Sequence, residues 1–372
     1  MTATDHPGSS RNRRFRGVGD TLEVSYDEFC GALAAKDLQP LWTQAAKLMP
    51  SEPIPHTLPW LWKWTTVLPL AQRAGELIAI GRGGERRVLA LANLGLGGLP
   101  YTSSTLWGAY QYLGAHESAP AHRHTPSALR FVIEGTGVWT TVDGDACDMS
   151  PGDVVLTPSW TWHDHSNPTD APMVWFDGLD LPLAASLEAV FFEPYPELMQ
   201  KSAPDHNSSE RLFGGRAVKP LGEPASPRHS PLFIYRYRDT DEALEALLKA
   251  RGGPAASIEF VNPTNGSSAM PTLGCEMHRL APGQRTPPRR KVGSSVYVTF
   301  KGRGFTVING ERFDWERGDA FVTPSWATIE HEALEPADLF AVTDRPVLEA
   351  LHLYREERLT TPQEATRNFQ PK

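Results

Sequence analysis

Three histidines, His122, His124 and His163, have the residue type and spacing to hold one divalent metal ion. If the segment around Arg123 is a β-strand, His122 and His124 point to the same face about 7 Å apart. His163 follows a Thr-Pro-Ser-Trp turn further along the chain, where a barrel closing on itself can bring its side chain beside the first two. A His-x-His pair by itself is often only a polar surface. The third histidine, placed in this way, favours a metal site.

The composition excludes several other classes of function. A net charge of −8 makes nucleic acid an unexpected partner, because phosphate binding normally requires a basic face. The three cysteines, Cys30, Cys147 and Cys275, show no CxxC spacing, so neither a disulfide framework nor a thiolate zinc site is indicated. No apolar run reaches the roughly 20 residues that a membrane span needs. We therefore expect a cytoplasmic protein that binds no membrane.

The elements that position these histidines are mostly short strands. Apolar spacing predicts short helices at 26–36 and 41–49. From residue 76 onward, runs rich in Val, Leu, Thr and aromatic residues are broken by Gly, Pro and Asp every eight to twelve residues, which is typical of an antiparallel barrel or sandwich. A helix is expected at 241–251, and another after Leu351.

An internal repeat indicates that one barrel occurs twice. The segment that starts at Phe131, FVIEGTGVWTTVDGDACDMSPGDVVLTPSW, resembles the segment that starts at Val298, VTFKGRGFTVINGERFDWERGDAFVTPSW. Both contain a Gly-x-Gly turn, a hairpin turn, a Gly-Asp pair and Thr-Pro-Ser-Trp. We divide the chain into an N-terminal arm with a helical or extended segment (1–75), a first, metal-binding barrel (76–193), an interdomain connection with a helix (194–255), a second barrel (256–350) and a C-terminal helix and tail (351–372).

The second copy lacks the three histidines. Arg289, Lys291 and Ile329 stand where His122, His124 and His163 stand in the first copy. Arginine does not deprotonate and isoleucine has no donor atom, so we expect no metal in the second barrel and a structural or assembly role for it.

The region around His163 resembles the second cupin motif, G-x5-P-x-G-x2-H-x3-N. Gly152, Pro158, His163 and Asn167 occupy its positions, and Trp160 replaces its middle glycine. The resemblance implies a mainly β, bicupin fold, in which two double-stranded β-helix, jelly-roll-like barrels carry short flanking helices.

The first cupin motif also matches, with one informative departure. His122 and His124 form its His-x-His and Gly135 its last glycine, but Ala128 stands where most metallo-cupins carry a glutamate ligand. Three neutral histidines suit a metal such as Fe(II) and leave its charge at +2. That charge favours an anionic substrate that chelates through two oxygens, as an ortho-hydroxybenzoate does, with a position left for dioxygen.

The combination is similar to the bicupin ring-cleaving dioxygenases that act on gentisate, salicylate or 1-hydroxy-2-naphthoate. The similarity extends from about Leu38 to Leu351 and is carried by PLWTQAAKLMP, GRGGERRVLALANLGLGG, WGAYQYLGAHESAPAHRH and TWHDHSNPTDAPMVWFDGLD. It implies one Fe(II) per chain, a homotetramer, and extradiol-type insertion of both atoms of O2 between the carboxyl-bearing and hydroxyl-bearing carbons. Gentisate, which gives maleylpyruvate, is the expected substrate because it is the commonest in the family.

The same resemblance implies roles for six further residues. Arg86 and Arg130 would hold the substrate, Trp107 and Gln111 would line the pocket, and the catalytic groups would be His165 and Asp177. Each has an ordinary alternative. The guanidinium of Arg130 could form a surface salt bridge, and Arg87 could take the place of Arg86. The ring of His165 could make only an outer hydrogen bond in a turn, and Asp177 could be an ordinary residue at a strand end.

Other functions stay open at this point. Salicylate, amino- or nitro-substituted salicylates and 1-hydroxy-2-naphthoate present the same chelating pair of oxygens as gentisate. A cupin of another class could be a metal-dependent isomerase or decarboxylase, or a non-catalytic binding protein. Oxygen consumption with an aromatic acid would distinguish these classes.

Overall fold

The computed structural model describes residues 25–78, 87–203, 205–215, 218–222 and 228–371. The chain forms two units, Met1–Glu52 and Pro53–Lys372. In the first unit, the described elements are α1 (Tyr26–Ala34), a 3-10 turn η1 (Leu41–Thr43) and α2 (Ala45–Leu48). Ser25 and Glu28 form a capping box at the start of α1, which satisfies backbone N–H groups that have no partner within the helix.

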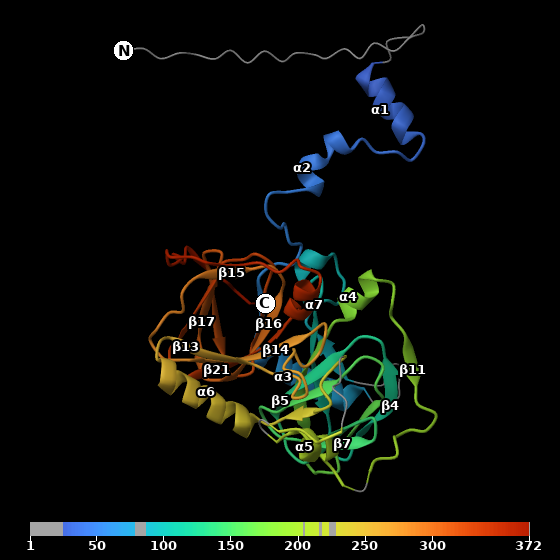
Figure 1. Ribbon diagram of the computed structural model, residues 1–372, viewed down its shortest axis with the longest axis vertical. Helices are drawn as coiled ribbons and strands as arrows, with labels where there is room; N and C mark the ends of the chain where they lie inside the picture. Colours follow the sequence, from blue (N-terminus) through green and yellow to red (C-terminus); the bar gives the residue numbers. More distant parts are fainter. Residues whose placement is uncertain (1–24, 79–86, 204, 216–217, 223–227, 372) are drawn as a thin grey trace. The chain divides into compact units, whose positions relative to one another are not determined.

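The first barrel of the second unit is built from two antiparallel sheets, coloured mainly cyan to green in Figure 1 apart from the yellow β12. One sheet has the order β12-β8-β5-β10-β3-β2, and the other has the order β11-β4-β9-β6-β7. The strands are β2 (Val88–Ala90), β3 (Trp107–Leu113), β4 (Ser118–His124), β5 (Ala128–Glu134), β6 (Val138–Val142), β7 (Asp145–Met149), β8 (Val154–Thr157), β9 (His163–Ser166), β10 (Met173–Leu179), β11 (Phe192–Pro194) and β12 (Ile234–Tyr235).

The second barrel repeats this plan with the sheets β1-β19-β16-β21-β14-β13 and β22-β15-β20-β17-β18-β23, coloured orange to red in Figure 1 apart from β1. The mainly β, two-barrel fold expected from the repeat is confirmed. The strands are β1 (Trp60–Trp62), β13 (Ala255–Glu259), β14 (Gly274–Leu280), β15 (Arg289–Lys291), β16 (Ser295–Lys301), β17 (Arg303–Ile308), β18 (Glu311–Glu316), β19 (Ala320–Thr323), β20 (Ile329–Ala333), β21 (Ala337–Thr343), β22 (Glu356–Arg358) and β23 (Arg367–Asn368).

The remaining helices of this unit are short or lie beside the barrels. They are α3 (Trp64–Leu77), η2 (Leu94–Leu96), α4 (Leu181–Ser186), α5 (Ser208–Phe213), α6 (Tyr237–Arg251) and α7 (Arg345–Ala350). None of the helices in the described part of the chain is long and apolar enough to cross a membrane.

The helix expected after Leu351 is wrong. The helix α7 ends at Ala350, and the chain continues as β22 and β23, which pair with β15 and β18. Without these strands the backbone groups of β15 and β18 would lack partners along one edge of the sheet. Pairing satisfies those groups, and this outweighs the local helical spacing of the sequence.

Each barrel gains an edge strand from a segment outside its own repeat. The strand β1 pairs with β19 of the second barrel, and β12 pairs with β8 of the first. A helix follows each of these strands, α3 after β1 and α6 after β12. The two strand-helix pairs, β1 with α3 and β12 with α6, are therefore related by the same pseudo-symmetry as the two barrels.

The Gly-Asp pair of the repeat fastens these helices to the barrels. Asp319 accepts the backbone N–H of Trp64 at 2.7 Å, and Asp153 accepts that of Tyr237 at 2.9 Å. Each aspartate also pairs with the cation directly before its helix: Lys63 Nζ lies 2.5 Å from Asp319, and Arg236 Nη1 lies 2.8 Å from Asp153. Negative charge at a helix N-terminus is favourable because the unpaired N–H groups there point outward.

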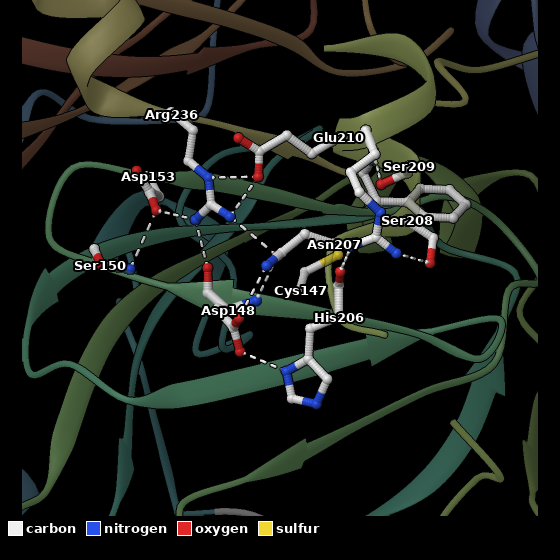
Figure 2. A network of polar contacts seen from close by, with 12 residues as sticks. Cys147, Asp148, Ser150, Asp153, His206, Asn207, Ser208, Ser209, Glu210 and Arg236 are labelled. Atoms are coloured by element: carbon white, nitrogen blue, oxygen red, sulfur yellow. Dashed lines mark hydrogen bonds and ion pairs between the residues drawn. The ribbon is translucent and has the colours of Figure 1, made fainter. Parts of the chain in front are cut away.

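Figure 2 shows that the guanidinium of Arg236 joins α5, α6 and the first barrel. Besides Asp153, it bonds to the Glu210 carboxylate at 2.5 Å, the Asn207 side-chain oxygen at 3.0 Å and the Asp148 carbonyl at 2.5 Å. Hydrogen bonds and two carboxylates raise the pKa of Arg236 against the effect of its burial. The network is a structural fastening on the outside of the barrel.

A shared core lies between the two barrels. Phe131 stacks on Phe340 with ring centroids 4.2 Å apart, and both belong to an apolar cluster that draws on strands of both barrels. The interior of each barrel holds a separate cluster. Alternate residues of β5 therefore face the other barrel or the interior of the first.

Candidate metal centre and substrate pocket

The structure brings His122, His124 and His163 together inside the first barrel. The first two are carried by β4, and His163 begins β9, where it lies opposite His122 in the strand register. One ligand atom from each side chain lies within 4.8 Å of the others. Among the described residues, this is the only group of three or more His, Cys, Asp or Glu side chains that could hold one metal ion.

Backbone carbonyls orient all three rings. The Nδ1 atoms of His122, His124 and His163 lie 3.0, 2.7 and 3.2 Å from the carbonyl oxygens of residues 120, 126 and 161. A carbonyl can only accept, so each Nδ1 carries the proton and each Nε2 presents its lone pair. Fixing the tautomer in this way is what metal-binding histidines require. The donor set therefore fits a divalent metal ion.

No carboxylate completes this set among the described residues. Ala128, at the position where the cupin motif carries glutamate, is buried on β5 and offers only a methyl group. The three histidine ligands are neutral, so a bound ion would keep its full charge toward a substrate.

Arg130 and Asp177 form a buried pair across β5 and β10. The two residues are direct partners in the strand register, and Arg130 Nε lies 3.6 Å from Asp177 Oδ1. Arg130 is only 1% exposed, so the surface salt bridge considered from the sequence does not describe it. Burial lowers the pKa of the guanidinium, and Asp177 opposes this.

The strand pattern places both side chains on the inner face of the barrel. Val132 on β5 and Trp175 on β10 belong to the interior cluster, whereas Phe131 belongs to the core between the barrels. Arg130 is two residues from Val132 and Asp177 is two residues from Trp175, so both share the inward face.

Neighbouring side chains fix the orientation of this pair. Arg130 Nη1 donates to Thr157 Oγ1 at 3.0 Å, and the indole N–H of Trp175 donates to Asp177 Oδ1 at 3.0 Å. Sequence reasoning missed the contacts of both Thr157 and Trp175. Thr157 begins the Thr-Pro-Ser-Trp turn of the repeat, but a turn motif does not indicate a hydrogen bond to Arg130.

Gln111 and Trp107 lie on β3, next to β10. Gln111 is opposite Trp175 in the register, is buried, and its side-chain oxygen accepts no hydrogen bond from any described residue. Trp107 is at the start of the strand, opposite Leu179, and is half-buried. Both are an even number of residues away from Leu113 on this strand, so their side chains lie on the same inward face as that of Leu113.

His165 lies on β9 with the metal-binding His163, not in a turn. Its ring is fully buried, with its centroid 6.4 Å from that of His163 and 5.1 Å from that of Trp175. Its Nδ1 atom lies 2.8 Å from Thr140 Oγ1. Thr140 is a third residue that the sequence interpretation missed, although its counterpart in the repeat, Thr306, is also a threonine.

Arg86 lies outside the described residues, but its neighbour Arg87 does not. Arg87 Nη1 donates to the carbonyl of Gly75 in α3 at 2.7 Å, and Nη2 pairs with Glu117. Arg87 therefore links α3 to the first barrel through these two contacts.

Comparison with known proteins agrees with this geometry. The cupin-domain family matches residues 109–179. The chain is 48% identical to a gentisate 1,2-dioxygenase of Streptomyces sp. over 89% of this chain and 95% of that protein. It is 37% identical to a 5-aminosalicylate 1,2-dioxygenase of Comamonas sp. over 92% and 93% of the two chains.

Solved structures show the same relationship. The salicylate 1,2-dioxygenase of Pseudoaminobacter salicylatoxidans, in its adduct with gentisate, superposes with a TM-score of 0.86 at 44% identity, covering 93% of this chain and 96% of that one. Identity at this level over nearly the whole length of both chains defines a family. The chain therefore belongs to the gentisate and salicylate 1,2-dioxygenase family of cupin oxidoreductases.

Proposed function

We propose that this protein is an Fe(II)-dependent dioxygenase that opens the ring of gentisate to give maleylpyruvate. The observation that carries the proposal is the three-histidine cluster, with no carboxylate among its described members, inside a barrel whose inner face also carries the buried Arg130. The relatives that are gentisate dioxygenases support the choice of substrate.

The metal proposed for the cluster is iron, one ion per chain. Three imidazoles suit a borderline divalent ion such as Fe(II), and the identity of the relatives as dioxygenases supports iron over zinc. When held by the three histidines, the ion would bind the two chelating oxygens of the substrate and would supply the redox chemistry with dioxygen.

Arg130 would hold the carboxylate of the substrate. Its planar guanidinium can bond a carboxylate through two parallel N–H groups, and its orientation is already set by Thr157 and Asp177. Asp177 acts through Arg130 and is a positioning residue in this proposal. Arg86 would be a second cation for the same anion.

His165 would hold or move a proton at the hydroxyl of the substrate. Its Nδ1 is tied to Thr140, so the ring cannot rotate without breaking that hydrogen bond. Its place beside His163 and away from solvent suits proton transfer at a bound phenol. Trp107 and Gln111 would line the pocket and restrict the orientation of the ring.

In the overall reaction, the bond between the carboxyl-bearing carbon and the adjacent hydroxyl-bearing carbon breaks. One molecule of dioxygen is consumed, and both of its atoms end in the product. The residues of this chain contribute binding, orientation and the exclusion of water, which is the usual share of the protein when a metal carries the redox chemistry.

A second candidate substrate class is the salicylates. The comparison with salicylate and 5-aminosalicylate 1,2-dioxygenases favours it, because these relatives are 44% and 37% identical to this chain. These acids keep the carboxylate and adjacent hydroxyl that the proposed site needs, as 1-hydroxy-2-naphthoate also does.

Oxygen uptake by the iron-loaded protein tests both the reaction and the substrate. Gentisate, salicylate, 5-aminosalicylate and 1-hydroxy-2-naphthoate are supplied in parallel, with benzoate as a control that lacks the chelating hydroxyl. We expect one O2 consumed per gentisate and fastest turnover with that acid. Conversion of an aromatic acid without oxygen uptake would instead indicate an isomerase or decarboxylase, and binding without conversion would indicate a non-catalytic cupin.

The family resemblance further supports a homotetramer that works in the cytoplasm, with a first, metal-binding barrel at 76–193 and a second at 256–350. Sedimentation velocity of the iron-loaded protein tests the assembly, and a predominantly monomeric species at micromolar concentration would contradict it.

A further inference from the structure

The second barrel contains a cavity at the position equivalent to the metal centre of the first barrel, and this cavity opens to solvent beside β22. It has a volume of about 330 Å³ and is lined by residues that include His278, Arg289, His331 and Arg358. An adjoining hollow of about 220 Å³ shares His278 and Arg289 and reaches Lys291.

Two of the three positions of the metal ligands are occupied by cations in this barrel, and Ile329 occupies the third. Arg289 lies opposite Ile329 in the strand register, as His122 lies opposite His163. Lys291, at the position of His124, is buried. No described residue makes a hydrogen bond or ion pair with the guanidinium of Arg289 or the ammonium of Lys291, whereas Arg290 between them pairs with Glu357 at 2.8 Å. The two inward cations therefore differ from their outward neighbour in making no direct hydrogen bond or ion pair with a described residue, although Glu276 interacts with both of them at longer range.

A second arginine faces the same space. Arg358 on β22 is the direct cross-strand partner of Arg289, so the two like charges stand side by side at the cavity. Like charges directly opposite each other in a sheet are destabilising unless an anion lies between them. The arrangement is therefore that of a site which an anion would complete.

The carboxylates nearby balance these cations only in part, although Glu276 and Glu356 raise the pKa of Arg289 against the effect of its burial. Glu356 accepts the hydroxyl of Tyr354 at 2.9 Å, and Glu276 lies 3.2 Å from His278 and 3.5 Å from Arg345. Arg345 is itself paired with Glu259 at 2.6 Å. Arg289, Lys291 and Arg358 against Glu276 and Glu356 leave one net positive charge.

The two histidines of the cavity, His278 and His331, do not change this net charge. Burial lowers the pKa of His278 and, more strongly, of His331, and the nearby Arg289 and Lys291 lower both further. Both rings are therefore neutral at pH 7. The hydroxyl of Tyr297, a fully buried residue whose ring is next to both histidines, makes no hydrogen bond with any described residue.

We propose that this cavity binds a small organic carboxylate, with Arg289 and Arg358 holding the carboxylate group. A single negative charge matches the net charge of the site, and two guanidinium groups favour the planar carboxylate. Leu280, Pro254 and Pro287 supply an apolar wall for the organic part of the ligand. The positive charge that a metal would provide in the first barrel is supplied here by fixed side chains.

Calorimetric titration with benzoate tests the proposal in the full-length chain. The His163→Ala variant is used as the background, so that the metal centre of the first barrel does not contribute. We expect one benzoate per chain, and the added substitution Arg289→Gln should weaken binding at least about tenfold because a charge-assisted hydrogen bond pair is lost. Arg358→Gln should have the same effect, and because Arg358 is exposed, this variant should retain the fold.

The matched control is Arg290→Gln, which removes an outward cation from the same strand and should leave the affinity unchanged. Benzoate binding that persists equally in the Arg289→Gln and Arg358→Gln variants would belong to the first barrel and would overturn the proposal. Binding of inorganic phosphate without binding of benzoate would also overturn it, because the site would then not be one for organic carboxylates. These results do not depend on oxygen uptake, so they are independent of the proposed dioxygenase activity.

Discussion

The Nδ1 atom of His165 lies 2.8 Å from the hydroxyl oxygen of Thr140, inside the barrel that carries the metal-binding histidines. The second barrel repeats this contact at the same distance between His331 and Thr306. The hydrogen bond is therefore a feature of both barrels, but only in the first does the oriented imidazole lie beside three potential metal ligands. The same substitution can therefore be made at Thr140 and at Thr306, and the second serves as the internal control for the first.

Replacement of Thr140 by Val should lower kcat about tenfold with a smaller effect on KM, because an unanchored His165 would serve proton transfer poorly. Thr140→Ser should restore most of the activity, since it restores the hydroxyl. The control Thr306→Val makes the same change beside His331 and should leave kcat unchanged. Steady-state oxygen uptake measures all three variants. Equal losses in Thr140→Val and Thr306→Val would show that the hydrogen bond acts only on stability.

Replacement of His163 by Ala should remove the metal. Two histidines separated by one residue cannot enclose an ion without the third ligand, so we expect the metal content to fall from about one per chain to near zero and turnover to be lost. Inductively coupled plasma mass spectrometry measures the content, and circular dichroism checks the fold. Lys291→Met, at the position of His124 in the second barrel, should leave the iron content unchanged. Full activity in His163→Ala would refute the assignment of the site.

The sequence was sufficient to predict those parts of the site that follow from the repeat. Comparing the two copies identified His122, His124 and His163 as a set and showed that Arg289, Lys291 and Ile329 could not replace them. The family resemblance pointed to Arg130, and the structure places this residue on the inner face of the barrel.

Contacts between distant segments could not be predicted in the same way. The partners Thr140 and Thr157 became recognisable only when strands far apart in sequence were paired, because a threonine in a strand is ordinarily explained by β propensity. The exchanged strand β1 and the C-terminal strand β22 depend on an open sheet edge elsewhere in the chain, which local spacing does not show.

Arg130 and Asp177 should contribute differently to stability and to substrate binding. Arg130→Gln leaves a buried carboxylate without its cation, so we expect a loss of about 3–5 kcal/mol in the free energy of unfolding together with a raised KM. In the double variant Arg130→Gln/Asp177→Asn, neither member of the pair carries a charge, and much of the stability should return. Urea unfolding and oxygen uptake measure the two properties separately.

The outcome of the double variant decides the role of Arg130. If the guanidinium holds the substrate, KM stays high although the stability has recovered. If KM recovers together with the stability, Arg130 serves only to hold the barrel together.

Gly152 should be more sensitive to substitution than another glycine with a similar backbone. Its φ is +88°, and an added Cβ would lie 2.5 Å from the ring of Tyr237 at the start of α6. Gly283 also has a positive φ, +68°, but nothing lies within 4 Å of its added Cβ. We expect Gly283→Ala to cost about 1–2 kcal/mol through its backbone alone.

Gly152→Ala should cost about 1–3 kcal/mol beyond that value, because the helix must move to relieve the overlap. Urea unfolding of the two variants gives the comparison. Equal costs would mean that the contact between α6 and the first barrel adjusts without loss of energy.

Asp180 should make the stability of the protein depend on pH. Burial raises the pKa of this carboxyl from 3.8 to about 6 in the folded state, although the hydroxyl of Thr272 donates to it. Between these two values the folded protein keeps a proton that the unfolded chain has released. The contribution of Asp180 to stability is therefore present below pH 4 and is lost as the pH rises through about 6.

Replacement of Asp180 by Asn removes this dependence, because the amide stays neutral and its oxygen can still accept from Thr272. A shift of about two pKa units corresponds to roughly 3 kcal/mol, so the variant should gain up to about that much relative to wild type between pH 4 and pH 7.5. Urea unfolding at several pH values measures the gain, and Asp27→Asn, at an exposed carboxyl, serves as the control. A difference between variant and wild type that stays constant over this range would mean that Asp180 is ionised in the folded protein throughout, and that its polar neighbours fully compensate for its burial.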